Sequence, residues 1–313
     1  MPSLVHDLLA WAIPRLRGSG DLDDADAERA RIERWHAGLD RSLPTGRLSR
    51  TSTRYDVRTT DEPFPVHTLR PRGARPRTTV LYLHGGGYVA PADPVHVRYA
   101  LRLARHLDAE VVLPDYPLAP EHTWRDSHDA LVDLLTGLAA TQDRVVVAGD
   151  SAGGGLALAV AQTVRDRGGR QPSHLVLHAP WADLTTTSAD REARAHDAVD
   201  PWLFLSKLEA YAAWWAGDPA DLRRPEVSPA HADLTGLPPT IVFCGTRDLL
   251  VRDARLLADR AAALPGGGED GWDLTYLEAP DLIHVFGILP GLPEARRAWR
   301  HTTAFLDGRE QPR

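Results

Sequence analysis

Residues 145–154 read Val145-Val146-Val147-Ala148-Gly149-Asp150-Ser151-Ala152-Gly153-Gly154. An apolar run followed at once by Gly-x-Ser-x-Gly is typical of a strand that turns sharply into a helix, with the serine held exposed and strained at the turn. Glycine is needed on both sides, because a Cβ there would collide with the neighbouring strand or helix. The stretch predicts Ser151 as a nucleophile. A glycine-rich turn without a chemical role is the alternative.

Short β-rich runs recur along the chain, and from the third run onward helix-like segments separate most of them. Strands that alternate with helices predict βαβ crossovers and a parallel sheet. Continuous apolar runs such as 145–147 suit strands that are covered on both faces. We therefore expect an α/β fold, mostly parallel, with helices on both faces. The expected strands are residues 53–60, 65–70, 78–84, 110–115, 144–149, 174–179, 240–245 and 273–278, and the helices that accompany them are 94–107, 122–140, 152–167, 201–216, 252–264 and 293–306.

Composition narrows the class of protein. The 313 residues carry a formal net charge of −7, which argues against a nucleic-acid partner. Cys244 is the only cysteine, so an internal disulfide and a cysteine-based metal site are excluded. Cys244 is also a weak alternative nucleophile, because no glycine-flanked turn surrounds it. A single cysteine favours a reducing, cytoplasmic compartment.

The N-terminal segment could be mistaken for a signal peptide. However, His6 and Asp7 interrupt its apolar run, and no basic region precedes it. The spacing of Leu4, Leu8, Leu9 and Ile13 instead predicts one face of a helix. A second, charged helix is expected over residues 21–35. No apolar stretch has transmembrane length, so we expect no stable membrane anchor.

A second glycine-rich motif, His84-Gly85-Gly86-Gly87, ends the strand Val80-Leu81-Tyr82-Leu83. A tetrahedral oxyanion needs preorganised donors, and glycine N–H groups can approach it without side chains in the way. With an elbow serine, one donor comes from the following residue, Ala152, and others come from a loop of this type. We expect Gly86, Gly87 and Ala152 to form an oxyanion hole, to which Gly85 could add a donor. A merely flexible turn is the alternative.

With these two motifs, and with two further stretches, the chain resembles the hormone-sensitive-lipase-like (bacterial family IV) esterases of the α/β-hydrolase fold. The further stretches are Asp115-Tyr116-Pro117-Leu118-Ala119-Pro120-Glu121 and the segment from Ser228-Pro229 to Asp248. The motifs occur in the family's order over roughly residues 80 to 290. The resemblance implies an eight-stranded sheet and hydrolysis of short- to medium-chain carboxylic esters. It also implies a helical cap built from residues 1–45 and from an insertion at 185–225, so that residues 46–184 and 226–313 form the two parts of the catalytic core.

A serine nucleophile needs a base and an acid, which in this fold follow it in the order Ser, Asp, His. His284 follows the last β-run, and its His284-Val285-Phe286 context matches the family's base, whereas His301 lies within a helix. Asp248 follows a strand at the edge where catalytic groups gather. Asp183 is the rival acid, and Asp281 is disfavoured by its closeness to His284 in sequence.

Other residues receive supporting roles. We expect Asp115 and Glu121 to brace the glycine loop, and Asp150 to be structural. Substrate choice is assigned to the cap, where most aromatic side chains should pack between helices and a few should line an apolar pocket. The pocket candidates are Tyr88, Trp202, Tyr211 and Trp215.

The resulting hypothesis is a serine carboxylesterase that acts on a small-molecule ester, with no metal or other cofactor and with a homo-oligomer left open. An amidase or acyltransferase could use the same triad, since an acyl-enzyme accepts several nucleophiles. A non-catalytic ligand-binding module, like the plant gibberellin receptors that lack the histidine, is a further alternative. The presence of His284 argues against it.

Overall fold

A computed structural model describes the chain except for residues 1, 18–19, 46–50, 266–269 and 313. The run Gly266-Gly267-Gly268, which predicts a surface loop, therefore lies outside the described residues. Eight strands form one sheet in the order β1-β2-β4-β3-β5-β6-β7-β8. β2 is antiparallel to β1 and β4, and every other neighbouring pair is parallel. The strands are β1 (Tyr55–Thr60), β2 (Val66–Pro71), β3 (Thr78–Leu83), β4 (Glu110–Pro114), β5 (Arg144–Asp150), β6 (His174–His178), β7 (Thr240–Gly245) and β8 (Leu274–Ala279).

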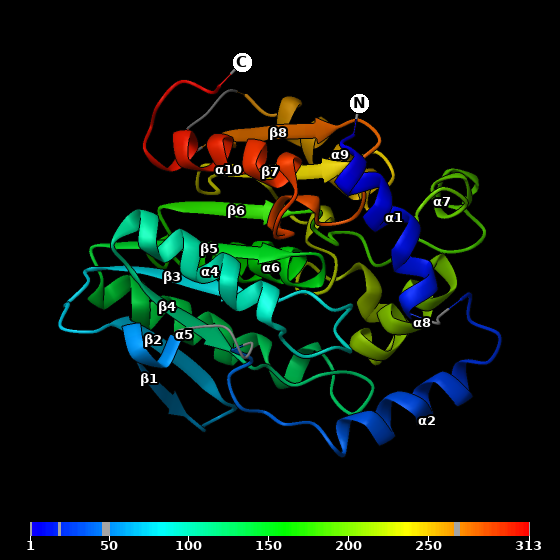
Figure 1. Cartoon of the computed structure of the whole chain (residues 1–313), viewed down its shortest axis with the longest axis horizontal. Coiled ribbons are helices and arrows are strands. Elements are labelled where there is room, and N and C mark those ends of the chain that lie inside the picture. The colour runs from blue at the N-terminus through cyan, green and yellow to red at the C-terminus, as the bar shows by residue number, and fades with distance from the viewer. Residues whose placement is uncertain (1, 18–19, 46–50, 266–269, 313) are drawn as a thin grey trace.

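Helices cover both faces of this sheet (Figure 1). α4 and α10 lie on one face, where Tyr99 of α4 meets Trp299 of α10 edge to face, and α5, α6 and α9 lie on the other. The predicted α/β-hydrolase-like, mostly parallel architecture is confirmed. The covering helices are α4 (Pro94–Leu107), α5 (His128–Thr141), α6 (Ala152–Asp166), α9 (Val251–Ala262) and α10 (Pro293–Leu306), and a short helix α3 (Thr51–Arg54) precedes β1.

The remaining helices gather beyond the carboxyl ends of the parallel strands (Figure 1). They come from two distant parts of the chain that bind each other: the Tyr211 hydroxyl donates to Glu28 Oε1 at 2.7 Å, and Leu22 N–H donates to Ser206 Oγ at 2.9 Å. These segments therefore form one layer beyond the carboxyl ends of the parallel strands. Their helices are α1 (Leu4–Arg17), α2 (Ala25–His36), α7 (Arg191–Asp197) and α8 (Leu205–Ala216).

The structure corrects the expected face of α1. Leu4 and Leu8 are exposed, whereas Ile13 is buried as expected and Leu9 is half-buried, and His6 and Ala10 complete the buried stripe. A polar side chain lies in this stripe because His6 Nε2 accepts a hydrogen bond from Ile283 N–H at 3.1 Å. Apolar spacing alone could not show that a histidine has a buried partner.

Other differences concern element boundaries: the helices expected at 122–140 and 201–216 begin only at His128 and Leu205. Residues 51–54 are helical, so β1 begins two residues later than expected. α7 was not predicted, because its sequence is mostly charged; Asp190 begins it by accepting from the N–H groups of Glu192 and Ala193. In the part of the chain that the structure describes, no helix is long and apolar enough to cross a bilayer.

Candidate active site

Ser151 lies at the turn between β5 and α6. Its backbone has φ 53° and ψ −125°, a region that non-glycine residues rarely occupy, and its N–H donates to His178 O at 2.8 Å. A Cβ on Gly149 would overlap the carbonyl of Gly153, and one on Gly153 would overlap the carbonyls of Leu83 and His84. The turn therefore has the strained geometry that Gly-x-Ser-x-Gly predicts.

Asp248 and His284 meet at the same end of the sheet. Asp248 follows β7 and His284 follows β8, and His284 Nδ1 is 2.9 Å from Asp248 Oδ2. The other carboxylate oxygen, Oδ1, accepts from Leu250 N–H at 2.9 Å. Both side chains are buried, with 0% of Asp248 and 4% of His284 exposed. This pairing leaves Nε2 of the imidazole as the atom that can take a proton from a nucleophile.

Charges around His284 set its proton affinity. Burial alone would lower the pKa of the imidazole, but the carboxylates of Asp248, Asp200 and Asp150 outweigh burial and raise it. The hydrogen bond that the imidazole donates to Asp248 contributes in the same direction. The imidazole is therefore prepared to hold a proton that it receives during a reaction.

The rival acids have other partners. Asp183 Oδ1 accepts from Thr185 N–H at 2.9 Å and pairs with His231 Nε2 at 3.0 Å. Asp281 has φ 61°, and its N–H donates to Thr246 Oγ1 at 2.8 Å. Cys244 is buried with its Sγ 3.5 Å from Asp248, and burial first, then the charge of Asp248, raises the pKa of this thiol. Of the candidate carboxylates, the structure brings Asp248 to the histidine.

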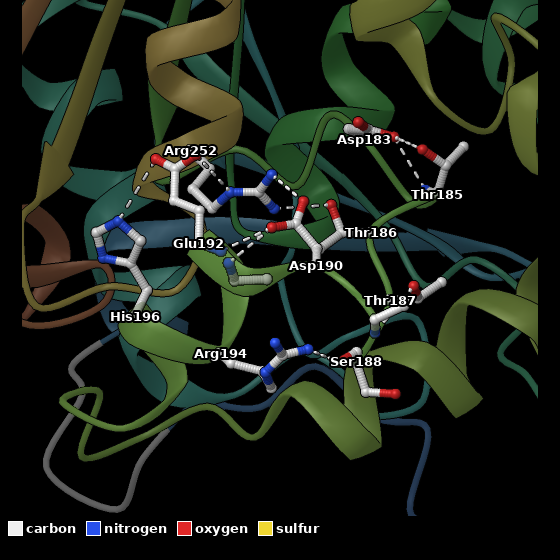
Figure 2. A network of polar contacts seen from close by, with 12 residues as sticks. Asp183, Thr185, Thr186, Thr187, Ser188, Asp190, Glu192, Arg194, His196 and Arg252 are labelled. Carbon is white, nitrogen blue, oxygen red and sulfur yellow. Dashed lines mark hydrogen bonds and ion pairs between the residues drawn. The ribbon is translucent and has the colours of Figure 1, made fainter.

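Asp183 belongs instead to a polar network at the start of the 185–225 insertion (Figure 2). In this network Arg252 of α9 donates to Asp190 Oδ2 at 2.6 Å and to Thr186 Oγ1 at 3.3 Å. Arg194 donates to the carbonyl of Ser188 at 2.5 Å. The contacts of Arg252 tie the insertion to the helix that follows β7.

The glycine loop after β3 carries backbone N–H groups toward the elbow. Gly86 and Gly87 have φ of 119° and 62°, and a Cβ on Gly86 would lie 2.6 Å from Ala90 O. Gly85 N–H donates to Asp150 Oδ1 at 3.2 Å, so this N–H is engaged and does not serve as the extra donor considered from the sequence. Among the described residues, no acceptor is found for the N–H groups of Gly86, Gly87 and Ala152.

Asp150 has the structural role expected for it. Its buried carboxylate accepts from Tyr82 Oη at 2.7 Å and lies 3.3 Å from His96 Nε2, besides its bond to Gly85. Burial alone would raise the pKa of Asp150, but His96 and these hydrogen bonds lower it to about 2. Asp150 is the residue before Ser151, and its ionised carboxylate thus holds the glycine loop next to the serine turn.

The segment 115–121 braces the glycine loop, but through different atoms from those predicted. The Tyr116 hydroxyl donates to His84 O at 2.7 Å, and Ala119 N–H donates to Tyr88 O at 2.9 Å. Asp115 instead binds Arg41 at 2.6 Å, because the N-terminal segment offers a guanidinium there. Glu121 Oε2 likewise lies 2.7 Å from His36 Nδ1 of α2. The two acids therefore hold the N-terminal segment to the core.

The four predicted pocket residues fall into two pairs. Tyr88 and Trp215 are buried and stacked, with ring centroids 4.2 Å apart and planes 4° apart. Trp202 and Tyr211 are only half-buried. Trp202 meets the His284 ring edge to face at 5.9 Å, and a Cβ on Gly87 would lie 3.1 Å from Tyr211 Cδ2.

Asp200 and His6 contact the loops that carry Asp248 and His284, and neither contact was predicted from the sequence. Asp200 Oδ2 accepts from Leu249 N–H at 2.7 Å, and His6 Nε2 accepts from Ile283 N–H. An Asp-Pro dipeptide at position 200 marks a turn, and no local pattern marks His6. Across the described residues, no three His, Cys, Asp or Glu side chains are grouped so that they could hold a metal ion.

Comparison with known proteins agrees with this geometry. Residues 80–288 match the family described as alpha/beta hydrolase fold. An acetyl-hydrolase of Streptomyces hygroscopicus is 36% identical over 232 residues, covering 73% of this chain and 75% of its own. The carboxylesterase NlhH of Mycobacterium tuberculosis is 31% identical, covering 84% and 82%.

Solved structures of esterases resemble this chain over nearly its full length. The crystal structure of an esterase from the bacterial hormone-sensitive lipase family has a TM-score of 0.74 and 28% identity, covering 99% of both chains. The esterase EstE5, soaked with p-nitrophenyl butyrate, has a TM-score of 0.77 and 26% identity, covering 98% of both chains.

Proposed function

The chain belongs to the α/β-hydrolase family and is a carboxylic ester hydrolase related to the bacterial hormone-sensitive-lipase esterases, and from this premise we propose a serine mechanism for it. Ser151 is the nucleophile, His284 the base and Asp248 the acid. The observation that carries this proposal is the buried Asp248–His284 pair, 2.9 Å apart, at the sheet edge that also holds the strained Ser151 turn.

In the proposed acylation step, Ser151 Oγ attacks the ester carbonyl carbon while His284 Nε2 takes the hydroxyl proton. The tetrahedral intermediate then expels the alcohol, which leaves with the proton from His284. Water attacks the resulting acyl-enzyme, again giving its proton to His284, and the acid departs as Ser151 recovers its hydrogen. Asp248 keeps Nδ1 protonated and Nε2 facing the serine, and it stabilises the imidazolium.

The negative charge on the intermediate's oxygen requires donors. The N–H groups of Gly86, Gly87 and Ala152 are proposed to bind it, and this assignment is supported by their lack of another acceptor among the described residues. Asp150 supports the assignment further, because it ties the glycine loop to the serine turn. The donors are thus fixed before the charge develops.

Residues 1–45 and 185–225 are proposed to form a cap that selects the ester. The hydrogen bonds that join α8 to α2 and to the segment before α2, beyond the carboxyl ends of the parallel strands, support this proposal. Trp202 and Tyr211 would contact the substrate directly, whereas the buried pair Tyr88 and Trp215 would shape the wall behind them. We propose short- to medium-chain substrates, in line with the acetyl-hydrolase name of one relative.

A panel of p-nitrophenyl esters of increasing acyl length tests this substrate range. We expect kcat/KM to be highest for acetate to octanoate esters and to fall for longer chains. Equal or higher kcat/KM for palmitate would contradict it. Adding a competing alcohol shows whether the acyl group goes to water or to another acceptor, which separates hydrolysis from acyl transfer.

The pH profile tests the base. The reaction needs a neutral imidazole, and the surrounding carboxylates raise the pKa of His284 above the usual value of about 6.5. We therefore expect kcat/KM to fall as the pH is lowered through a single limb that lies on the alkaline side of that value. A rate that is constant between pH 5 and 9, with chemistry shown to be rate-limiting, would contradict a histidine base.

Truncation tests the cap. Removing residues 1–40 should uncover apolar surface and open the pocket, lowering solubility and raising KM by about tenfold or more, equivalent to ~1.4 kcal/mol of binding free energy. Ser151 should still react with an organophosphate, because the core that holds it remains. Unchanged solubility and kinetics would show that these helices are not a cap.

A further inference from the structure

Asp200 is a buried carboxylate between α7 and α8, with 8% of its surface exposed. Its Oδ1 accepts from the N–H groups of Trp202 and Leu203, at 2.7 and 3.0 Å. Its Oδ2 accepts from Leu249 N–H at 2.7 Å. One side chain therefore joins the 185–225 insertion to the turn that follows β7.

That turn carries Asp248. Two successive N–H groups of the turn donate hydrogen bonds to different carboxylates. Leu249 N–H donates to Asp200, and Leu250 N–H donates to Asp248 itself. The turn is thereby fixed from both sides, and Asp248 Oδ2 remains directed at His284 Nδ1. A shift of Leu249 would move Asp248 with it.

The second connection runs through Trp202. Asp200 fixes the backbone of Trp202, whose ring meets the imidazole of His284 edge to face, with planes at 79° and centroids 5.9 Å apart. The Asp200 carboxylate is thus connected to Asp248 through Leu249 and to His284 through Trp202.

We propose that Asp200 is a positioning residue of the active site, which holds the Asp248 turn and Trp202 in place around His284 and adds a second negative charge beside the imidazole. This inference rests on the proposed serine mechanism. In that mechanism the imidazole becomes positively charged in both tetrahedral steps, so a nearby fixed carboxylate favours the transition state over the resting enzyme.

The charges facing these groups agree with such a role. The titratable groups with the largest effects on Asp200 are Asp248 and His284, and those with the largest effects on His284 are Asp248, Asp200 and Asp150. Burial, and then the charge of Asp248, raises the pKa of Asp200 to about 6, against the opposing effect of His284 and the backbone N–H bonds. Asp200 is therefore ionised in the upper part of the pH range from 5 to 9.

The test compares Asp200→Asn with Asp197→Asn. Asp197 is a matched control, because it also lies in the insertion and accepts a backbone N–H, that of Leu205 at 2.7 Å, but it is not among the groups with the largest effects on His284. Hydrolysis of p-nitrophenyl acetate is measured from pH 5 to 9, with thermal unfolding of each variant as the control for folding.

We expect Asp200→Asn to lower kcat roughly 10- to 100-fold with little change in KM, the loss typical of a slightly misplaced catalytic group. The acid limb of its kcat/KM profile should move to lower pH, because a charge that raises the pKa of His284 is gone. Asp197→Asn should stay within about twofold of the parent. The proposal would be overturned if Asp200→Asn left both kcat and the acid limb of the kcat/KM profile unchanged. An equal loss of kcat in Asp197→Asn would overturn it as well.

Asp200→Glu keeps the charge but lengthens the side chain, and it decides the matter if Asp200→Asn does not fold. It should lower kcat and leave the acid limb where it is. Parental kcat in Asp200→Glu would overturn the positioning role. If instead Ser151→Ala keeps the parental activity, the serine mechanism itself has failed, so the two failures are distinguishable.

Discussion

Replacing Ser151 with alanine should lower kcat for a carboxylic ester by about 10⁶-fold, because no other group can form the acyl-enzyme. The fold should survive, since alanine differs only by the lost hydroxyl and the N–H of residue 151 can still donate to His178 O. Steady-state hydrolysis of p-nitrophenyl acetate measures the loss, and circular dichroism and thermal unfolding measure the fold.

Ser188→Ala is the matched control for this experiment. Ser188 is an exposed serine of the insertion, far in sequence from the elbow, and its removal should leave kcat within about twofold. Near-parental activity in a folded Ser151→Ala variant would remove the basis of the serine mechanism.

Asp248→Asn should lower kcat by about 10⁴-fold. An amide in place of the carboxylate favours the wrong imidazole tautomer and removes the charge that stabilises the imidazolium. The buried geometry makes the effect severe, since Asp248 is 0% exposed and no water can substitute for it. The loss should appear in kcat more than in KM, because the carboxylate acts on the histidine and not on the substrate.

Asp183→Asn supplies the comparison, because Asp183 is the rival acid and also pairs with a histidine, His231, at 3.0 Å. We expect this variant to keep activity within about tenfold of the parent, with any loss reflecting the network that ties the insertion to α9. If Asp183→Asn proves the more damaging change, the acid has been assigned wrongly.

The fold was predictable because its signals are local. Buried parallel strands such as β5 and β6 are short apolar runs bounded by turns, and every predicted strand begins and ends within two residues of the observed one. The positions of Asp248 and His284 followed from the same pattern, since Asp248 lies in the loop after β7 and His284 in the loop after β8, and the carboxyl ends of both strands lie at the same end of the sheet.

The supporting contacts were not predictable for the opposite reason. Asp200 and Leu249 are 49 residues apart, and His6 and Ile283 are 277 apart. Both bonds end on a backbone N–H, which every residue but proline possesses, so no pairing of residue types reveals them. Asp115 and Glu121 bind the side chains of Arg41 and His36, which lie 74 and 85 residues away in sequence, so no local pattern reveals these partners either.

Covalent labelling of the whole protein by an organophosphate, followed by peptide mass spectrometry, tests the central claim most directly. The account predicts one adduct, on the peptide that contains Ser151, formed in step with the loss of esterase activity. It further predicts no adduct in Ser151→Ala and much slower labelling in His284→Ala, where the serine has no base. An adduct on another residue, or full labelling of Ser151 with esterase activity retained, would contradict the account.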